Sequence, residues 1–291
     1  MITVLGASGN TGRAVVRTLL AAGEEVRAVG RRADRLAQLA PGAVPFAGDA
    51  ADRGFLADAF TGADAAYVLS PFDAFAAGYR QQQRAVGEAI AGALADARVR
   101  HVVALSSLGA EQDADTGFLS SLHDQELRLR ALDADVLFLR PGLFFESFAV
   151  SLDAMRAEGV HADSIDPDVA LPVVATADVA AVAAQALLAR AGSGVREVLG
   201  PRDRTVPEVV AALGPRIGVP SLRYVRVPDE AMRAALVQAG LPADVADLQV
   251  RMNAALNAGV VRSTQGRSAA TSSPTEFEEW ADALPAPSVP A

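Results

Sequence analysis

The stretch that decides the fold is the first one, MITVLGASGNTGRAVVRTLL at residues 1–20. A short apolar run stops at Gly6, and Gly9 and Gly12 lead into an apolar-rich segment that ends at Ala22-Gly23. This pattern predicts a strand, a tight turn and a helix. Gly6 allows the sharp turn, Gly9 removes a side chain that would hold a phosphate off the backbone, and Gly12 lets the helix lie close to the strand.

The predicted turn is suited to a dinucleotide. The first N–H groups of a helix and the positive end of its dipole favour an anion such as a pyrophosphate. A second predicted strand, EVRAVG at residues 25–30, closes a βαβ unit of the length typical of such sites. We therefore expect a dinucleotide here, rather than a turn with only a structural role. The expected contacts are Gly6, Ser8, Gly9, Asn10, Thr11 and Gly12.

Two arginines, Arg31 and Arg32, follow the second predicted strand. In sites that choose NAD, an acidic residue at this point takes the ribose 2′-hydroxyl. An arginine instead suits a 2′-phosphate, because its planar guanidinium can donate two parallel hydrogen bonds. The pair therefore predicts NADP(H) as the cofactor. The alternative is a solvated pair at the start of a helix over residues 33–39.

Strands and helices alternate at short intervals through the first half of the chain. Strands are predicted at residues 2–5, 25–30, 44–48, 65–69, 98–105 and 135–139. This rhythm predicts an α/β fold of Rossmann type, a doubly wound parallel sheet whose ligand lies beyond the carboxyl ends of the strands. Asp49 could bind the adenine edge there or cap its own turn. The other residues expected beside the cofactor are Ser70, Ser106 and Pro141.

Beyond residue 142 the rhythm loosens, and we expect a smaller, mostly helical C-terminal lobe. The pattern predicts a polar loop containing His161 and a helix that begins at Ala177 with Thr176 as its cap. Capping boxes at Thr205–Glu208 and Ser273–Glu276 predict two further helix starts. The predicted division is a Rossmann domain at 1–150 joined by 169–200, a substrate or partner lobe at 151–168 and 201–284, and a disordered tail at 285–291.

The composition excludes several classes of site. The chain has 291 residues, 51% of them hydrophobic, and a net charge of −9 without a basic run, so direct binding to nucleic acid is unfavourable. It contains no cysteine, which rules out disulfides, thiolate metal sites and cysteine nucleophiles. It also contains no lysine, because all 26 basic residues are arginine. A mechanism that needs a lysine ammonium is therefore closed to this chain.

Targeting, metal and hydrolase signals are missing from the sequence as well. No charged-then-apolar leader precedes the first strand, and the most apolar region, residues 169–189, is interrupted by proline and polar residues. We therefore expect a cytoplasmic protein without a membrane span. No two of the three histidines have the spacing of metal ligands, so we expect no metal site. Ser107 follows a strand but lacks the G-x-S-x-G pattern of a serine hydrolase.

Seven segments together resemble the NmrA-like family of atypical short-chain dehydrogenase/reductases. They are GASGNTG at 6–12, VGRR at 29–32, AGD at 47–49, HVVALSS at 101–107, FLRPGLFFESF at 138–148, ATADVAAVAAQAL at 175–187 and VLGPRDRTVPEVVAAL at 198–213. The resemblance implies an NADP(H)-binding Rossmann fold with a small C-terminal lobe. It implies either a reductase, as in the quinone reductases and the reductases of plant phenolics, or a catalytically silent regulator that senses the cofactor.

The resemblance also directs attention to the helix that bears Glu126. Reductases of this kind carry a Tyr-x-x-x-Lys pair or a lysine alone, and the lysine of such relatives falls at Leu122 here, so the usual dyad is absent. His123 is the candidate catalytic residue, because imidazole titrates near neutrality and could protonate a reduced quinone oxygen. The alternative is an exposed helical histidine near a Glu126–Arg130 pair at i,i+4 spacing.

Two functions remain open at this point. An oxidoreductase would move hydride from NADPH to a flat, weakly polar acceptor such as a quinone, whose pocket we expect to be lined by aromatic side chains. These are Phe72, Phe144, Phe145 and Phe148, although such spacing also suits plain core residues. A sensor would instead use cofactor occupancy to change a surface recognised by a regulatory protein partner. The missing Tyr/Lys pair favours the sensor, and the electron-poor nature of quinones favours the enzyme.

Overall fold

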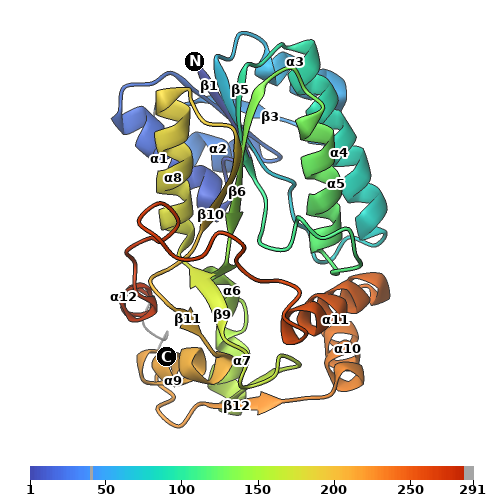
Figure 1. Ribbon diagram of the computed structural model, residues 1–291, viewed down its shortest axis with the longest axis vertical. Helices are drawn as coiled ribbons and strands as arrows, with labels where there is room; N and C mark the ends of the chain where they lie inside the picture. Colours follow the sequence, from blue (N-terminus) through green and yellow to red (C-terminus); the bar gives the residue numbers. More distant parts are fainter. Residues whose placement is uncertain (40–41, 285–291) are drawn as a thin grey trace.

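The computed structural model describes residues 1–39 and 42–284, and its upper half in Figure 1 is one seven-stranded sheet. The sheet has the order β10-β6-β5-β4-β1-β2-β3, and every pairing in it is parallel. Its strands are β1 (Ile2–Leu5), β2 (Val26–Gly30), β3 (Val44–Ala47), β4 (Ala65–Val68), β5 (His101–Leu105), β6 (Asp135–Pro141) and β10 (Gly194–Val198). The predicted doubly wound α/β fold is confirmed.

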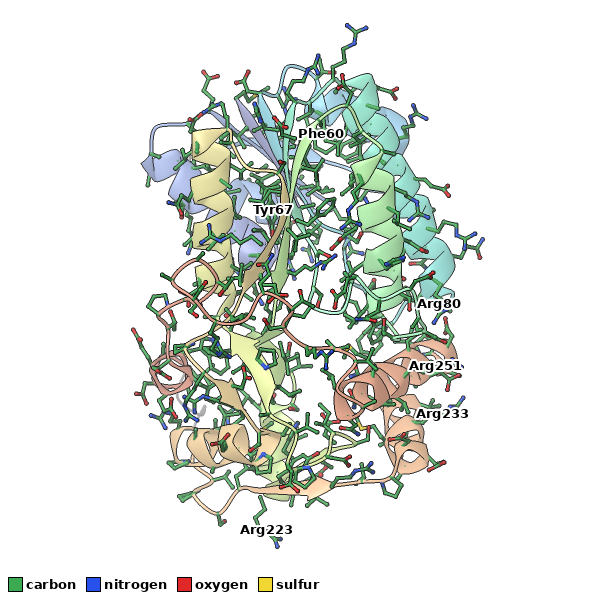
Figure 2. All side chains as sticks on the ribbon, in the orientation of Figure 1. Phe60, Tyr67, Arg80, Arg223, Arg233 and Arg251 are labelled. Carbon is green, nitrogen blue, oxygen red and sulfur yellow. The ribbon has the colours of Figure 1, made fainter. Side chains whose placement is uncertain are left out.

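Helices cover both faces of this sheet (Figure 1). One face carries α1 (Asn10–Ala21), α2 (Ala33–Leu39) and α8 (Thr176–Ala189), and the other carries α3 (Arg53–Phe60), α4 (Tyr79–Asp96) and α5 (Leu119–Arg130). In β1, Ile2 and Val4 pack into the first core and Leu5 into the second. The central strands β1 and β4 are therefore buried on both faces, as at Tyr67 in Figure 2, which explains why they read as unbroken apolar runs.

The lower half consists mainly of helices with two small sheets. One sheet joins β7 (Leu143–Phe144), β9 (Leu171–Val174) and β11 (Asp203–Arg204), and the other joins β8 (Val160–Asp163) and β12 (Arg223–Arg226). The helices are α6 (Glu146–Ala149), α7 (Leu152–Glu158), α9 (Val206–Arg216), α10 (Asp229–Gln238), α11 (Ala243–Asn257) and α12 (Phe277–Asp282). A separate hydrophobic core fills this half. By its hydrogen bonds β9 belongs to the lower half, whereas α8 and β10 lie with the large sheet.

Three local predictions for the chain beyond residue 142 are wrong. His161 lies in β8, not in a loop, because the distant strand β12 pairs with it in parallel. Thr176 lies inside α8, and its hydroxyl donates to Glu146 at 2.6 Å instead of capping the helix. The box predicted from Ser273 does not form, since α12 begins after Glu276 without a side-chain cap. The capping box at Thr205 is confirmed. The predicted tail, 285–291, lies outside the described residues.

Candidate functional site

The turn between β1 and α1 has a shape that only glycine permits at two positions. Gly6 has a φ of +75°, and a Cβ at Gly12 would lie 2.2 Å from the carbonyl oxygen of Gly6. The helix can therefore approach the strand only because Gly12 has no side chain. Gly9 is exposed, and a Cβ there would meet nothing nearer than the same oxygen at 3.4 Å. The backbone therefore does not require glycine at position 9. The remaining explanation for a glycine here is that a ligand needs the space a side chain would occupy.

The start of α1 has the properties of an anion site. Its N-cap is Gly9, no side chain caps it, and its first turn holds no acidic residue. The amides of residues 10–12 find no acceptor among the described residues. Such N–H groups, together with the helix dipole, favour a phosphate group placed against them. The residues present therefore fit the diphosphate of a dinucleotide.

Arg31 follows β2, and Asp73 lies in the loop after β4. These two strands flank β1 in the sheet, so the two side chains can meet across the end of β1. An Arg31 guanidinium nitrogen is 3.5 Å from a carboxylate oxygen of Asp73, and both side chains are exposed. An exposed pair of this kind contributes about 0–1 kcal/mol, so Arg31 can exchange Asp73 for a 2′-phosphate at little cost. Arg32 makes a closer pair with Asp34.

The other predicted rim residues lie at the same edge of the sheet. The carboxylate of Asp49 accepts a hydrogen bond from the amide of Ala51 at 3.0 Å, which is the turn-capping arrangement. Ser70 follows β4 and is half-buried. Pro141 ends β6, and its carbonyl oxygen accepts from the amide of Leu108 at 3.1 Å. The sheet therefore brings these residues to the edge that the glycine turn occupies, while the contacts predicted for them with a cofactor remain predictions.

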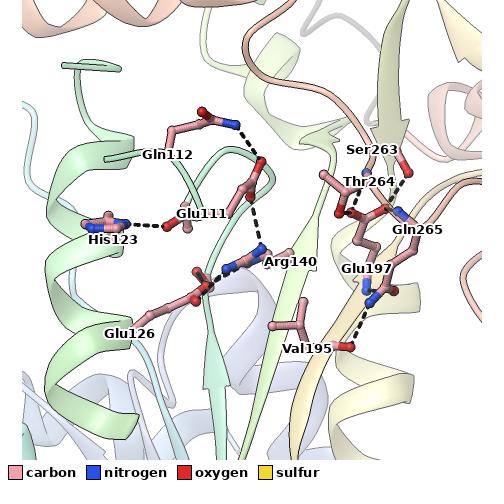
Figure 3. A network of polar contacts seen from close by, with 12 residues as sticks. Glu111, Gln112, His123, Glu126, Arg140, Val195, Glu197, Ser263, Thr264 and Gln265 are labelled. Atoms are coloured by element: carbon pink, nitrogen blue, oxygen red, sulfur yellow. Dashed lines mark hydrogen bonds and ion pairs between the residues drawn. The ribbon is translucent and has the colours of Figure 1, made fainter. Parts of the chain in front are cut away.

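A buried ion pair lies under the ends of β5 and β6 (Figure 3). Arg140 donates to both carboxylate oxygens of Glu126, at 2.8 and 2.7 Å, and the Ser106 hydroxyl donates to one of them at 2.6 Å. The side chains of Glu126 and Arg140 are only 2% and 6% exposed. Burial alone would raise the pKa of Glu126, but the hydrogen bonds from Arg140 and Ser106 hold that pKa below its usual range. Glu126 is therefore a carboxylate at neutral pH.

The network extends into the loop after β5. Arg140 also pairs with Glu111 at 3.0 Å, and the neighbouring Ala110 carbonyl oxygen is 2.9 Å from Nδ1 of His123 (Figure 3). Because a carbonyl oxygen only accepts, Nδ1 is the donor in this contact, and Nε2 of the neutral ring is left as an acceptor. His123 is half-buried on α5. The sequence indicated the pairing of Glu126 with Arg130, which is present, but not the central role of Arg140.

A small apolar hollow of about 50 Å³ lies between the ends of β5 and β6 and the lower half of the molecule. Ser107, Pro141 and Gly142 line it from the side of the large sheet. Met252 and Leu256 of α11, with Val261 beyond that helix, line it from the other side. Most of the lining is aliphatic, and none of it is charged. The hollow therefore suits a weakly polar group.

None of the four aromatic residues predicted for the acceptor pocket is among the residues that line this hollow. Phe145 and Phe148 are buried in the lower core against Phe277, which matches the alternative of plain core residues. Phe144 packs against one of the upper cores. Phe72 is 57% exposed and makes an edge-on contact with Phe118. The lining of the hollow was missed because its members are scattered aliphatic residues that only the fold brings together.

Two further features concern residues 1–39 and 42–284 as a whole. No helix in this part of the chain combines the length and the apolar content that crossing a membrane would require. Within the same ranges, no three His, Asp or Glu side chains gather closely enough to hold a metal ion.

Comparisons with known proteins cover nearly the whole chain. Residues 1–281 match the model of the NmrA-like family. The (4-alkanoyl-5-oxo-2,5-dihydrofuran-3-yl)methyl phosphate reductase of Streptomyces griseus is 31% identical over 286 residues, 96% of each chain. The NAD(P)H azoreductase of Xenophilus azovorans is 30% identical over 249 residues, 85% of this chain and 84% of the relative. An NADPH-dependent quinone oxidoreductase from Escherichia coli, solved with NADPH, superimposes with a TM-score of 0.81 at 22% identity, covering 97% and 98% of the two chains.

Proposed function

Because the chain belongs to the NmrA-like family, we propose that it is an NADPH-dependent oxidoreductase that reduces a flat, weakly polar acceptor such as a quinone. The observation that carries the proposal is the uncharged hollow at the carboxyl edge of the sheet, the edge that also holds the glycine turn. The two relatives named as reductases support the reaction type, and the structure solved with NADPH supports the cofactor. Both of these sequence relatives are named as reductases and neither as a regulator, so they favour a reductase over the regulatory alternative.

Two parts of this chain would hold the cofactor. The free amides of residues 10–12 bind the diphosphate, since no protein acceptor among the described residues competes for them. Arg31 leaves Asp73 and grips the 2′-phosphate through its guanidinium. Ser70 and Pro141 border the part of the rim that leads to the hollow. When bound, NADPH supplies the hydride.

Reduction of a quinone to a hydroquinone consumes one proton in addition to the hydride, because the hydride brings two electrons and only one of the two hydrogens. His123 is the proposed donor. Its Nδ1–H stays bonded to the Ala110 carbonyl, so the doubly protonated ring would release the proton on Nε2 and return to its neutral form. A quinone is electron-poor, so positioning by the protein contributes most of the rate and a weak donor suffices. This would explain how the chain works with leucine at position 122 in place of lysine.

The test is NADPH oxidation with a panel of quinones, comparing the parent with His123→Ala. The matched control is His101→Ala, at the start of β5 and therefore at the opposite edge of the sheet. We expect turnover in the parent, a loss of about a hundredfold in kcat for His123→Ala, and less than about a twofold change for the control. Binding of NADPH without turnover of any acceptor would contradict the proposal and favour the regulatory alternative. Equal rates for the parent and His123→Ala would remove only the proton-donor role.

A further inference from the structure

The segment between α11 and α12, residues 258–276, is here called the strap (Figure 1). It contains no helix or strand beyond a single bridge from Ser272 to Leu199, yet it follows the outer edge of β10 closely. The side-chain amide of Gln265 donates to the Val195 carbonyl at 2.9 Å and accepts from the Glu197 amide at 3.0 Å. The strap therefore covers an edge strand whose backbone groups would otherwise lack partners.

Glu197 anchors the strap (Figure 3). Its side chain is buried and accepts from the amide and hydroxyl of Thr264 at 2.7 and 2.8 Å and from the amide of Gln265 at 3.2 Å, with a further bond from Ser263. Burial alone would raise the pKa of Glu197, but these hydrogen bonds lower it, so the group is a carboxylate. In the parallel pairing of β10 with β6, Glu197 is the partner of Arg140, so the residue that holds the strap is the neighbour of the buried ion pair.

Val261 lies between this anchor and a second one. The amide of Val260 donates to the carbonyl of Ala255 in α11 at 3.0 Å, which fixes the beginning of the strap. The side chain of Val261 lines the hollow. It also lies against Gly109 in the loop that follows β5. A Cβ added to Gly109 would lie 3.0 Å from a Val261 methyl group. Val261 is thus held in place from both sides.

We infer that Val261 determines the size of ring that the acceptor site takes, and that Glu197 is the residue that positions it. The inference rests on the proposed function in treating the hollow as the acceptor site. At about 50 Å³ the hollow has room for about one or two water molecules, so a ring enters only if a wall moves. The ends of β5 and β6 are tied by the buried pair of Glu126 and Arg140, whereas the opposite wall includes a loop held by a few anchors. The part of the strap between its anchors at Val260 and Glu197 is the wall that yields, and the side chain of Val261 there contacts the ring.

The experiment compares Val261→Phe and Val261→Ala with Val260→Ala as the matched control, since Val260 is also half-buried but does not line the hollow. The first readout is the Kd of 2-naphthol, a flat two-ring compound that accepts no hydride, measured by calorimetry with and without NADP+. The second is the ratio of kcat/KM for 1,4-naphthoquinone to that for 1,4-benzoquinone. We expect Val261→Phe to weaken naphthol binding and to shift the ratio toward the single ring by about tenfold or more each. Val261→Ala should shift the ratio the other way by about threefold, and Val260→Ala by less than about twofold.

Glu197→Gln tests the positioning role. It preserves the size of the side chain but removes the charge that binds the strap, so the KM for naphthoquinone should change severalfold while the Kd of NADPH stays within about twofold of the parent. A purely structural role would lower the melting temperature without changing the preference between one ring and two. The parent failing to bind 2-naphthol, or Val261→Phe behaving like Val260→Ala in both readouts, would overturn the inference. Naphthol affinity that follows Val261 in a protein that reduces no quinone would uphold the inference and refute the proposed function.

Discussion

The two ends of the site are built in different ways. At the β1 end, one short segment makes the whole structure, and it does so with backbone atoms: Gly6 and Gly12 set the turn and the amides of residues 10–12 face outward. At the β5 and β6 end, side chains from distant segments make the structure, centred on the buried pair of Glu126 and Arg140. The difference teaches that the first end depends on local conformation, while the second depends on the fold being complete.

The largest effect should come from breaking the side-chain end. Glu126→Ala leaves the Arg140 guanidinium buried with only Glu111, and we expect the free energy of unfolding to fall by about 3–5 kcal/mol in urea denaturation. Glu88→Ala, on the exposed face of α4, should cost less than about 0.5 kcal/mol. The double variant Glu126→Leu with Arg140→Met should recover most of the loss, because it removes both deeply buried charges, and the partners that lose a contact, Glu111 and Arg130, are more exposed. A loss in Glu126→Ala no larger than in the control would show that the pair contributes little.

The backbone end should respond to the addition of a single methyl group. A Cβ at Gly12 would clash with the carbonyl oxygen of Gly6, so Gly12→Ala must shift the turn and should weaken NADPH binding by about a hundredfold, or about 2.7 kcal/mol. Gly9→Ala meets no such clash and should leave the melting temperature of the free protein unchanged. It should still weaken NADPH binding if the phosphates lie where we propose. If calorimetry found the same Kd of NADPH for Gly9→Ala and the parent, the proposed position of the phosphates at this turn would be refuted.

Cofactor choice gives a smaller effect at the same end. Arg31→Ala should weaken NADPH by about tenfold, or about 1.4 kcal/mol, because one exposed charge contact to the 2′-phosphate is lost. NADH should bind within about twofold of the parent. Arg32→Ala is the matched control, since its guanidinium is already engaged by Asp34. Equal losses for both cofactors in Arg31→Ala would refute the 2′-phosphate role.

The same contrast explains how much could be predicted from the sequence. The glycine turn and the first six strands of the large sheet, β1 to β6, were predictable, because each is encoded within a few consecutive residues. The pairing of Glu126 with Arg140 was not, since one residue lies on a helix and the other on a strand that only the fold brings together. His161 was placed in a loop because its partner strand lies about 60 residues further on, and no local pattern shows a pairing of that kind. The course of the strap was missed for the same reason, because the bonds that fix it to the large sheet go to Val195 and Glu197 of β10, about 70 residues earlier in the chain.

The smallest expected difference between the two ends is in how acid affects stability, and it does not show at neutral pH. Residues 6–12 contain no titratable side chain, so acid does not act on the turn directly. The folded protein holds the pKa of Glu126 below its ordinary value of 4.5, so this carboxylate contributes stability above that value and loses it as the pH falls through the lowered pKa. Unfolding free energy measured below about pH 4.5 should therefore decline less steeply in Glu126→Gln than in the parent, by under one proton per molecule.

Other carboxylates share this acid response, so the comparison needs a surface control. Asp96 also has a lowered pKa, because Arg53 donates to it, but the pair is exposed and screened by solvent. Asp96→Asn should change the slope below pH 4.5 less than Glu126→Gln does. If both variants changed this slope equally, burial of the Glu126–Arg140 pair would not explain the pH dependence of stability. The contrast between the two ends would then lie only in their construction and not in their response to acid.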